Sequence, residues 1–179
     1  MTETINRLKP FQGSPPVTSY FRFWIILVVV LFVDQLSKWV IVSLSGYELG
    51  HYPPFGGAVI IPGFFNLVYA VNLGAAWGML EGFSWLLIVL AMVFLTLIFV
   101  FRKDLQLHIP MHQICFSMVS GGIIGNTMDR LFRGHVVDFL DFHLPWYRWP
   151  TFNVADSAIV VGTLWYIYLQ FRTTKQNQS

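Results

Sequence analysis

Residues 21–44, FRFWIILVVVLFVDQLSKWVIVSL, form a long and nearly unbroken apolar run. A helix of about 20 residues crosses the hydrocarbon core of a bilayer, so this run predicts a membrane span. Runs of similar character follow at Phe83 to Phe101, Met111 to Leu131 and Asn153 to Phe171. Only 11% of the residues are charged, against about 25% in typical soluble domains. We therefore expect an all-α membrane protein with four transmembrane helices.

Composition and charge also exclude several classes of protein. The first run is too long for the core of a signal peptide, and no small-residue cleavage site follows it, so we expect it to persist as a helix. Cys115 is the only cysteine, inside a predicted span, and cannot build a disulfide framework. The net charge is only +2 and basic residues do not cluster with aromatics outside the membrane flanks, which argues against nucleic acid as a partner.

The distribution of Lys and Arg predicts the orientation of the chain. Four spans put both termini on one side, which then holds Arg7, Lys9, Arg22, Arg102, Lys103, Arg172 and Lys175. The opposite side holds only Arg130, Arg133 and Arg148. Because basic residues concentrate in cytoplasmic segments, we expect both termini in the cytoplasm. The loops at 45–82 and 132–152 then lie outside.

Three segments follow from this topology. We expect a flexible cytoplasmic extension at residues 1–20, a four-helix membrane domain at 21–172 and a cytoplasmic tail at 173–179. Residues 64–69, FFNLVY, lie between turn signals and predict a strand of a small extracytoplasmic sheet. The stretch at 46–60 matches no recognisable motif.

Polar side chains gather in the outer leaflet under this topology. Asp34 lies about 20 Å along the outward-running first helix, at a rise of about 1.5 Å per residue, so Asp34 and Lys38 fall in the outer half of the membrane. The third span ends outside and the fourth begins there. The same region therefore receives Asn72, Asn126, Asp129, Arg130, Asp138, Asn153 and Asp156.

Two groups of these residues have both structural and functional interpretations. Asp34 and Lys38 share a helix face at a spacing of four residues, and they either neutralise each other or take part in chemistry; support of a site is the favoured interpretation. Gly121 and Gly125 permit close helix packing. The stripe that follows them, Asn126, Asp129 and Arg130, faces the bundle, where Arg130 either snorkels to the interface or holds a carboxylate.

The carboxylates at 138 and 156 border apolar sequence. An ionisable group at membrane depth costs about 2.5 to 3.5 kcal/mol and is retained mainly where it serves a polar cavity or chemistry. Asp138 lies within VVDF, where burial should raise the pKa of its carboxyl group. Asn153 and Asp156 also fit a helix cap, so capping and chemistry both stay open for that pair. Two such carboxylates at one surface indicate a shared-proton dyad.

Histidines offer a competing site that we do not favour. His108 and His112 have the spacing of metal ligands, but they lie at the cytoplasmic start of the third span, away from the carboxylates. The sequence has neither a His-Glu-x-x-His motif nor a Gly-x-Ser-x-Gly nucleophile elbow. We therefore expect no metal centre and no serine nucleophile.

Five sequence blocks, in this order, resemble the bacterial lipoprotein signal peptidases (signal peptidase II). They are Val33 to Lys38, Asn72 to Trp77, Gly121 to Arg130, Val136 to Phe139 and Phe152 to Ser157, and the resemblance covers residues 22–170. Members of that family are four-helix aspartyl peptidases of the bacterial inner membrane. They remove the signal peptide of prolipoproteins by cleaving before a diacylglyceryl-modified cysteine. The membrane domain at 21–172 would then be the peptidase.

The resemblance implies that Asp138 and Asp156 form a catalytic dyad that activates water without a metal or other cofactor. It implies support or substrate-binding roles for Asp34, Lys38, Asn72, Gly122, Asn126, Asp129, Arg130 and Asn153. It also implies a sheet that cradles the substrate and a short surface helix at 140–150 over the site. The implied partners are a diacylglyceryl-modified prolipoprotein and membrane lipids, and we expect a monomer.

Two alternatives remain at the level of sequence. Asp129 could replace Asp138 in the dyad, although Arg130 beside it should keep Asp129 ionised and unsuited to sharing a proton. A small proton-coupled transporter or channel could use Asp34, Lys38, Asp129 and Asp138 as relay groups. A relay needs ionisable groups across the whole membrane, and the inner halves of the spans nearly lack them, so a surface-proximal enzyme is favoured.

Overall fold

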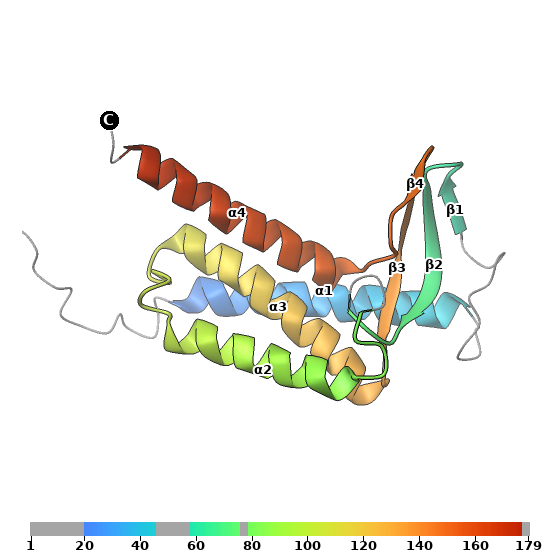
Figure 1. The fold of residues 1–179 in the computed structure, drawn as a ribbon, viewed down its shortest axis with the longest axis horizontal. Coiled ribbons are helices and arrows are strands. Elements are labelled where there is room, and N and C mark those ends of the chain that lie inside the picture. Colours follow the sequence, from blue (N-terminus) through green and yellow to red (C-terminus); the bar gives the residue numbers. More distant parts are fainter. Residues whose placement is uncertain (1–19, 46–57, 76–78, 177–179) are drawn as a thin grey trace, which may run out of the picture.

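A computed structural model describes residues 20–45, 58–75 and 79–176. Four helices lie side by side and a small sheet closes one end of the bundle (Figure 1). The elements in chain order are α1 (Phe21–Ser45), β1 (Ala58–Ile61), β2 (Phe65–Asn72), α2 (Ser84–Val100), α3 (Pro110–Phe132), β3 (Val136–Leu144), β4 (Tyr147–Arg148) and α4 (Val154–Gln176). The helices match the four predicted apolar runs. Residues 1–19 and 177–179, and thus most of the predicted extension and part of the tail, lie outside the described residues.

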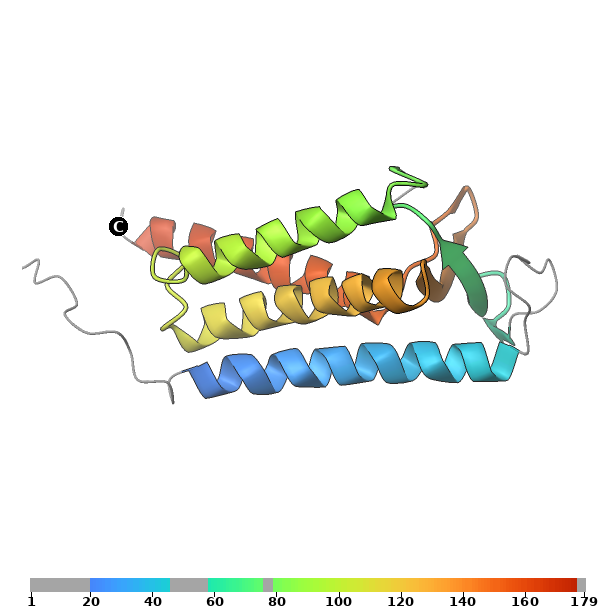
Figure 2. The same ribbon diagram turned by 90° about the horizontal axis from the view of Figure 1, so that it is seen from below.

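Helix α3 is the centre of the bundle and packs against α1, α2 and α4 (Figures 1 and 2). Its buried residues include polar ones along the whole helix, from His112 to Asp129. The outer helices instead expose large apolar side chains, such as Phe32 at 63% and Leu164 at 61%. Exposed apolar surface on this scale is typical of contact with lipid rather than water. The polar residues of α3 are therefore sheltered by the other three helices.

Two of the described helices are long and apolar enough to cross a membrane, Phe21–Leu44 in α1 and Val154–Arg172 in α4. Helix α2 is strongly apolar but has only 17 residues, about 25 Å at 1.5 Å per residue. Helix α3 has 23 residues, but its buried polar side chains lower its hydropathy. Because α3 meets protein on most sides, it needs no apolar surface there. The count of four spans stays a prediction.

Glycines let α3 approach its neighbours closely. A Cβ on Gly125 would lie 2.5 Å from Asp34 Oδ2, and one on Gly121 would lie 3.0 Å from Val30 Cβ. The predicted packing role of both glycines is thus confirmed. Gly122 is equally tight against α4, where a Cβ would lie 2.4 Å from the Ala155 carbonyl oxygen.

Replacement of Gly122 by alanine is expected to destabilise the bundle by about 1 to 3 kcal/mol, the usual cost of overpacking. The clash is with backbone at Ala155 and with Ile159 Cγ1 at 2.8 Å, so α4 itself has to move. Thermal unfolding in detergent measures the loss. Met92→Ala is the control, because the Met92 side chain is 56% exposed and packs little. An unchanged melting temperature for Gly122→Ala would contradict the close approach of α3 and α4.

The sheet is antiparallel with strand order β1-β2-β3-β4. Strand β2 contains most of the predicted strand at 64–69 and extends it to Asn72. Its pairing with β3 sets Asn72 opposite Val136 and Ala70 opposite Asp138. This register brings the end of β2 next to the carboxylate of β3. Two long loops, far apart in sequence, thus meet over the end of α3.

The predicted surface helix at 140–150 is wrong. Residues 140–148 belong to β3, a tight turn and β4, and His143 pairs with Arg148 across the hairpin, while 149 and 150 lie in neither a helix nor a strand. Strand β3 is rich in Val, Phe and Leu and is buried on both faces from Val136 to Phe139, and this composition favours strand over helix. Pro145 lies in the turn, where its missing N–H is not needed. The pairing partners come from β2, which local sequence cannot reveal.

Candidate active site

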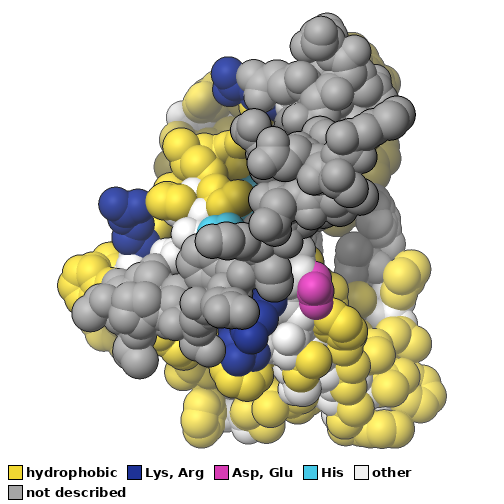
Figure 3. Space-filling model, turned by 90° about the vertical axis from the view of Figure 1, so that its left-hand side faces the viewer, with side chains coloured by type: hydrophobic (Ala, Val, Ile, Leu, Met, Phe, Trp, Pro, Cys, Tyr) yellow, Lys and Arg dark blue, Asp and Glu magenta, His cyan; other side chains and the backbone are white. Residues whose placement is uncertain are grey.

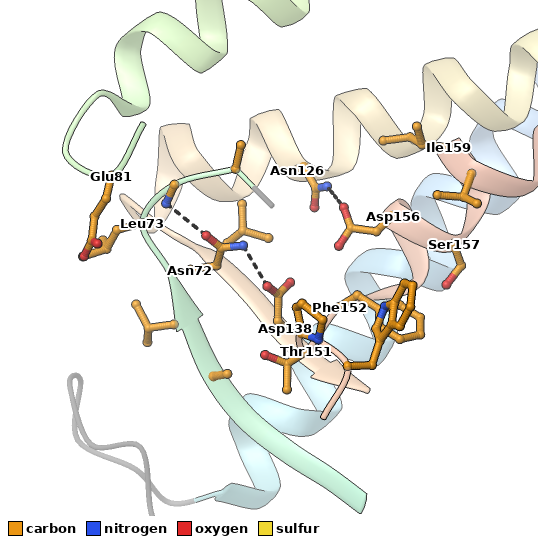
Figure 4. Close-up of a pocket in the computed structure, with 18 of the residues that line it drawn as sticks. Asn72, Leu73, Glu81, Asn126, Asp138, Thr151, Phe152, Asp156, Ser157 and Ile159 are labelled. Carbon is orange, nitrogen blue, oxygen red and sulfur yellow. Dashed lines mark hydrogen bonds between the residues drawn. The ribbon is translucent and has the colours of Figure 1, made fainter. Parts of the chain in front are cut away.

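A pocket of about 1230 Å³ lies where the sheet meets the ends of α3 and α4 (Figure 4). Most of its lining is apolar, from residues such as Leu73, Phe152 and Ile159. Asp138 and Asp156 enter it from different elements, and in Figure 4 both carboxylates point into the same space. A mostly apolar cavity with a few convergent polar groups is the usual form of a small-molecule or peptide site. The two carboxylates that sequence singled out therefore share one pocket.

Two asparagines hold the Asp138 carboxylate. Asn72 Nδ2 donates to Oδ2 at 2.9 Å and Asn153 Nδ2 donates to Oδ1 at 2.7 Å. Burial and the nearby Asp156 carboxylate raise the pKa of Asp138 from 3.8 to about 7, against the lowering effect of the two asparagines and of Lys38. The apolar flanks of Asp138 predicted this direction. Asp138 can therefore exchange a proton near neutral pH.

Asp156 belongs to the first turn of α4 and forms a reciprocal cap with Asn153. The Asn153 backbone N–H donates to Asp156 Oδ2 at 3.2 Å, and the Asp156 N–H donates to Asn153 Oδ1 at 3.0 Å. This is the arrangement of a capping box. Asn126 Nδ2 also donates to Asp156 Oδ1 at 2.7 Å. The capping interpretation is thus confirmed, and the same cap aims Asp156 at the pocket.

Lys38 fixes the orientation of the Asn126 amide. The ammonium of Lys38 can only donate, and it donates to Asn126 Oδ1 at 3.0 Å. Asn153 Nδ2 donates to the same oxygen at 3.2 Å. The Asn126 NH₂ group must therefore face Asp156. Every amide contact to the two carboxylates is an N–H donor, so the environment favours negative charge on the pair while burial opposes it.

Below the pocket, four charged side chains form a closed cluster. Lys38 Nζ lies 2.9 Å from Asp34 Oδ2 and 2.8 Å from Asp129 Oδ2, and all three side chains are fully buried. Asp129 also pairs with Arg133, one turn further along α3. The predicted pairing of Asp34 with Lys38 is thus confirmed. The cluster joins α1 to α3 directly beneath the candidate dyad.

Asp34 also contacts the start of α4. Its Oδ1 accepts the Ala155 backbone N–H at 2.9 Å. A carboxylate at a helix N-terminus satisfies an otherwise unpaired N–H and interacts favourably with the helix dipole. Asp34 therefore fixes the helix turn that carries Asp156, although it comes from a different helix.

The sequence favoured Arg130 as a residue that holds a carboxylate, but in the described part of the chain its hydrogen bonds go to backbone carbonyls. Its Nη2 donates to the Gly74 carbonyl at 2.8 Å and its Nη1 donates to the Asn126 carbonyl at 3.2 Å. Among the described residues, its buried Nε has no hydrogen-bond partner. Arg130 lines the pocket and clamps the loop after β2 to α3.

Several contributors were missed at the level of sequence. Gln35 donates to Asp34, to Asp129 and to the Gly125 carbonyl. Its position beside Asp34 gave a weak signal. Residues 147–152 form one wall of the pocket, and only their aromatic content hinted at a role. Gly122 does not line the pocket and instead lies where α3 approaches α4 closely.

The two histidines considered as metal ligands lie at the opposite end of the bundle. His112 Nδ1 is 3.1 Å from the Leu105 carbonyl, and its ring packs edge-on against Tyr166 at 5.2 Å. In the described part of the chain no group of three His, Cys, Asp or Glu side chains is placed to hold a metal ion. His112 is thus accounted for by packing.

The sequence of this chain is similar to a known family of proteins. A family model described as signal peptidase (SPase) II matches residues 26–172. A lipoprotein signal peptidase of Burkholderia cenocepacia (strain HI2424) is 39% identical over 168 residues, covering 90% of this chain and 95% of that protein. One of Thermodesulfovibrio yellowstonii is 35% identical over 150 residues, covering 83% and 93%.

Two solved structures of bacterial membrane enzymes, determined by the in meso method, have the same fold. Their TM-scores are 0.73 and 0.68, at 31% and 32% sequence identity. The first match covers 86% of this chain and 90% of the solved one, and the second covers 83% and 91%. Sequence and structure agree over most of the chain, which therefore belongs to the signal peptidase II family.

Proposed function

We propose that Asp138 and Asp156 form the dyad that hydrolyses the peptide bond at the end of a lipoprotein signal peptide. Family membership makes the chain a lipoprotein signal peptidase and a membrane enzyme, which decides against the transporter. The assignment of roles to residues is our proposal. Its main support is that two carboxylates from β3 and α4 point into one pocket and are held there by Asn72, Asn126 and Asn153.

The proposed reaction has no covalent intermediate. Two close carboxylates do not both ionise easily, so the pair keeps one proton near neutral pH. The protonated member donates a hydrogen bond to the scissile carbonyl, and the ionised member takes a proton from the attacking water. Collapse of the tetrahedral intermediate then returns a proton to the leaving amine. A pKa of about 7 for Asp138 suits both directions of transfer.

The proposed substrate is a prolipoprotein that carries a diacylglyceryl-modified cysteine, cleaved on the amino side of that cysteine. The pocket is larger than the range of about 300 to 1,000 Å³ that holds drug-sized ligands. Its apolar lining continues onto Val160 and Val161 of α4, which are 55% and 49% exposed. A substrate whose signal helix and acyl chains lie in the bilayer can enter sideways along this surface.

We further propose that the pocket faces the extracytoplasmic side of the inner membrane and that both termini are cytoplasmic. The end of the bundle opposite the sheet carries basic side chains on its surface (Figure 3). Arg22, Lys103 and Arg172 are exposed there, as expected for a cytoplasmic face. The sheet and the candidate dyad lie at the other end.

Cleavage in a defined system tests this function. The purified protein in detergent is expected to cut a diacylglyceryl-modified prolipoprotein and to leave the same protein without the lipid intact, as read by electrophoresis. The lipid dependence follows from the apolar, laterally accessible pocket. Equal cleavage of both forms would contradict the proposed substrate class, and no cleavage of either would contradict the function.

The pH dependence of activity should report Asp138. Because the pair must keep one proton, we expect kcat/KM to fall as pH rises through about 7. The hydrogen bond from Asn72 favours the charged form of Asp138, so Asn72→Ala should raise the pKa and move this alkaline limb to higher pH. An initial-rate profile from pH 5 to about 9 measures both effects. A limb that stays in place, or moves to lower pH, would contradict the assignment.

A further inference from the structure

Asp141 is a buried carboxylate that the proposed reaction does not use. It lies on β3 three residues after Asp138, and alternation along a strand turns the two side chains to opposite faces. Asp138 lines the pocket and Asp141 does not. Yet Asp141 is only 1% exposed. A carboxylate this deeply buried outside the membrane-spanning helices has to be compensated by its neighbours.

Three side chains from three strands surround it. Arg148 of β4 donates from Nε to Oδ1 and from Nη2 to Oδ2, both at 3.2 Å. His143 Nε2 lies 2.7 Å from Oδ2, and Asn66 of β2 donates to Oδ2 at 3.2 Å. Burial raises the pKa of Asp141, but these hydrogen bonds lower it further, so the net pKa is below the usual value. Asp141 is therefore ionised near neutral pH.

Arg148, which donates two hydrogen bonds to Asp141, is part of a pocket wall formed by residues 147–152. All six of these residues line the pocket. At its far end the wall runs into Asn153, which donates to Asp138. At its near end the wall begins with β4, where Arg148 donates two hydrogen bonds to Asp141. Between these ends, Trp149 N–H donates to the Phe142 carbonyl at 3.0 Å, and the Phe142 and Phe152 rings stack at 5.8 Å. The wall is thus fixed at both ends by a carboxylate.

We propose that Asp141 is a positioning residue for substrate binding, which holds the outer end of the pocket wall through Arg148. The inference rests on the proposed function of the pocket. Strand β4 has only two residues, Tyr147 and Arg148, so backbone pairing alone fixes little of it. The backbone of Phe152 pairs with Leu140 at the other end of the wall, and the ion pair of Arg148 with a buried partner adds a side-chain constraint at β4. Loss of this pair should loosen the wall without touching the proton-transfer groups.

The test compares steady-state kinetics of the purified, full-length variants on the lipidated prolipoprotein. Asp141→Asn and Arg148→Met should each raise KM about tenfold, the effect of one lost charged hydrogen bond. Their kcat should stay within about twofold of wild type, the signature of lost uniform binding. The two effects should be less than additive in the double variant, because both single variants remove the same ion pair. Arg148→Lys keeps the charge but loses the fork, and should fall between.

The melting temperature of each variant checks that it is folded. Asp104→Asn is the control variant, because it alters an exposed aspartate in the α2–α3 connection. If Asp141→Asn does not fold, the two Arg148 variants carry the test, since Arg148 is half exposed. An unchanged KM in the folded fraction, or a fall in kcat alone, would overturn the proposal, as would additive effects in the double variant. An error in the proposed dyad would be seen in a different experiment, as turnover by the Asp138→Asn or Asp156→Asn variant.

Discussion

Asp138→Asn and Asp156→Asn are each expected to lower kcat by at least about 10³-fold. General acid–base groups typically contribute about 10² to 10⁴-fold, and either substitution also removes one partner of the paired carboxylates. Asparagine has nearly the same shape but can neither take nor give a proton. The measurement is single-turnover cleavage of the lipidated prolipoprotein by purified variants. KM should change little, because neither substitution alters the apolar wall of the pocket.

The variant Asp129→Asn tests the alternative dyad that the sequence left open, in which Asp129 replaces Asp138. Asp129 is fully buried and its oxygens face Lys38 and Arg133 rather than the pocket. We expect Asp129→Asn to lose stability but to retain turnover per folded molecule. Asp104→Asn provides the neutral control. Turnover above about a tenth of wild type in either dyad variant would remove that residue from the chemistry.

Stability at high pH offers a second check on Asp138. Its pKa is 3.8 when unperturbed and about 7 in the folded protein, so the folded state binds its proton more tightly. The contribution to stability is therefore fully present below pH 3.8 and is lost as pH rises through about 7. Above that pH the wild type holds a buried charge that asparagine removes. The Asp138→Asn variant should melt no lower than wild type at about pH 8.

The sequence predicted those features of the site that depend on local periodicity. Asp34 and Lys38 at a spacing of four residues do pair, and Asn153 with Asp156 does cap α4. The same rule explains the error at Arg130. Adjacent residues on a helix point about 100° apart, so Asp129 shares its face with Arg133, four residues on, and not with Arg130. That pairing was present in the sequence and was missed.

Contacts between distant segments could not be predicted in this way. Nothing near Asp141 in the sequence indicates that Asn66 opposes it, because strand register depends on the pairing of two loops that are separated by two helices. The surface helix predicted at 140–150 failed for the same reason: the partner strand β2 decides the conformation of β3. Lys38 likewise reaches Asn126 only because Gly121 and Gly125 let α1 and α3 approach.

Lys38→Met is expected to destabilise the protein by about 3 to 5 kcal/mol, the usual effect of removing one partner from a buried ion pair. The reason is the charge balance of the cluster. Lys38 and Arg133 offset Asp34 and Asp129, and the Lys38, Asp34 and Asp129 side chains are fully buried. Methionine fills the same volume but leaves one negative charge without compensation. Thermal or denaturant unfolding in mixed micelles measures the loss.

The double variant Lys38→Met/Asp34→Asn decides whether charge or packing is responsible. It restores the balance, and an asparagine at position 34 can still accept the Ala155 N–H through its Oδ1. We therefore expect it to be more stable than Lys38→Met alone, a strongly non-additive result. If the two losses simply add, the cluster holds the helices by packing. Because Lys38 also lowers the pKa of Asp138, any activity left in either variant should show its alkaline limb at higher pH. A buried lysine would then serve both the fold and the proton balance of the site above it.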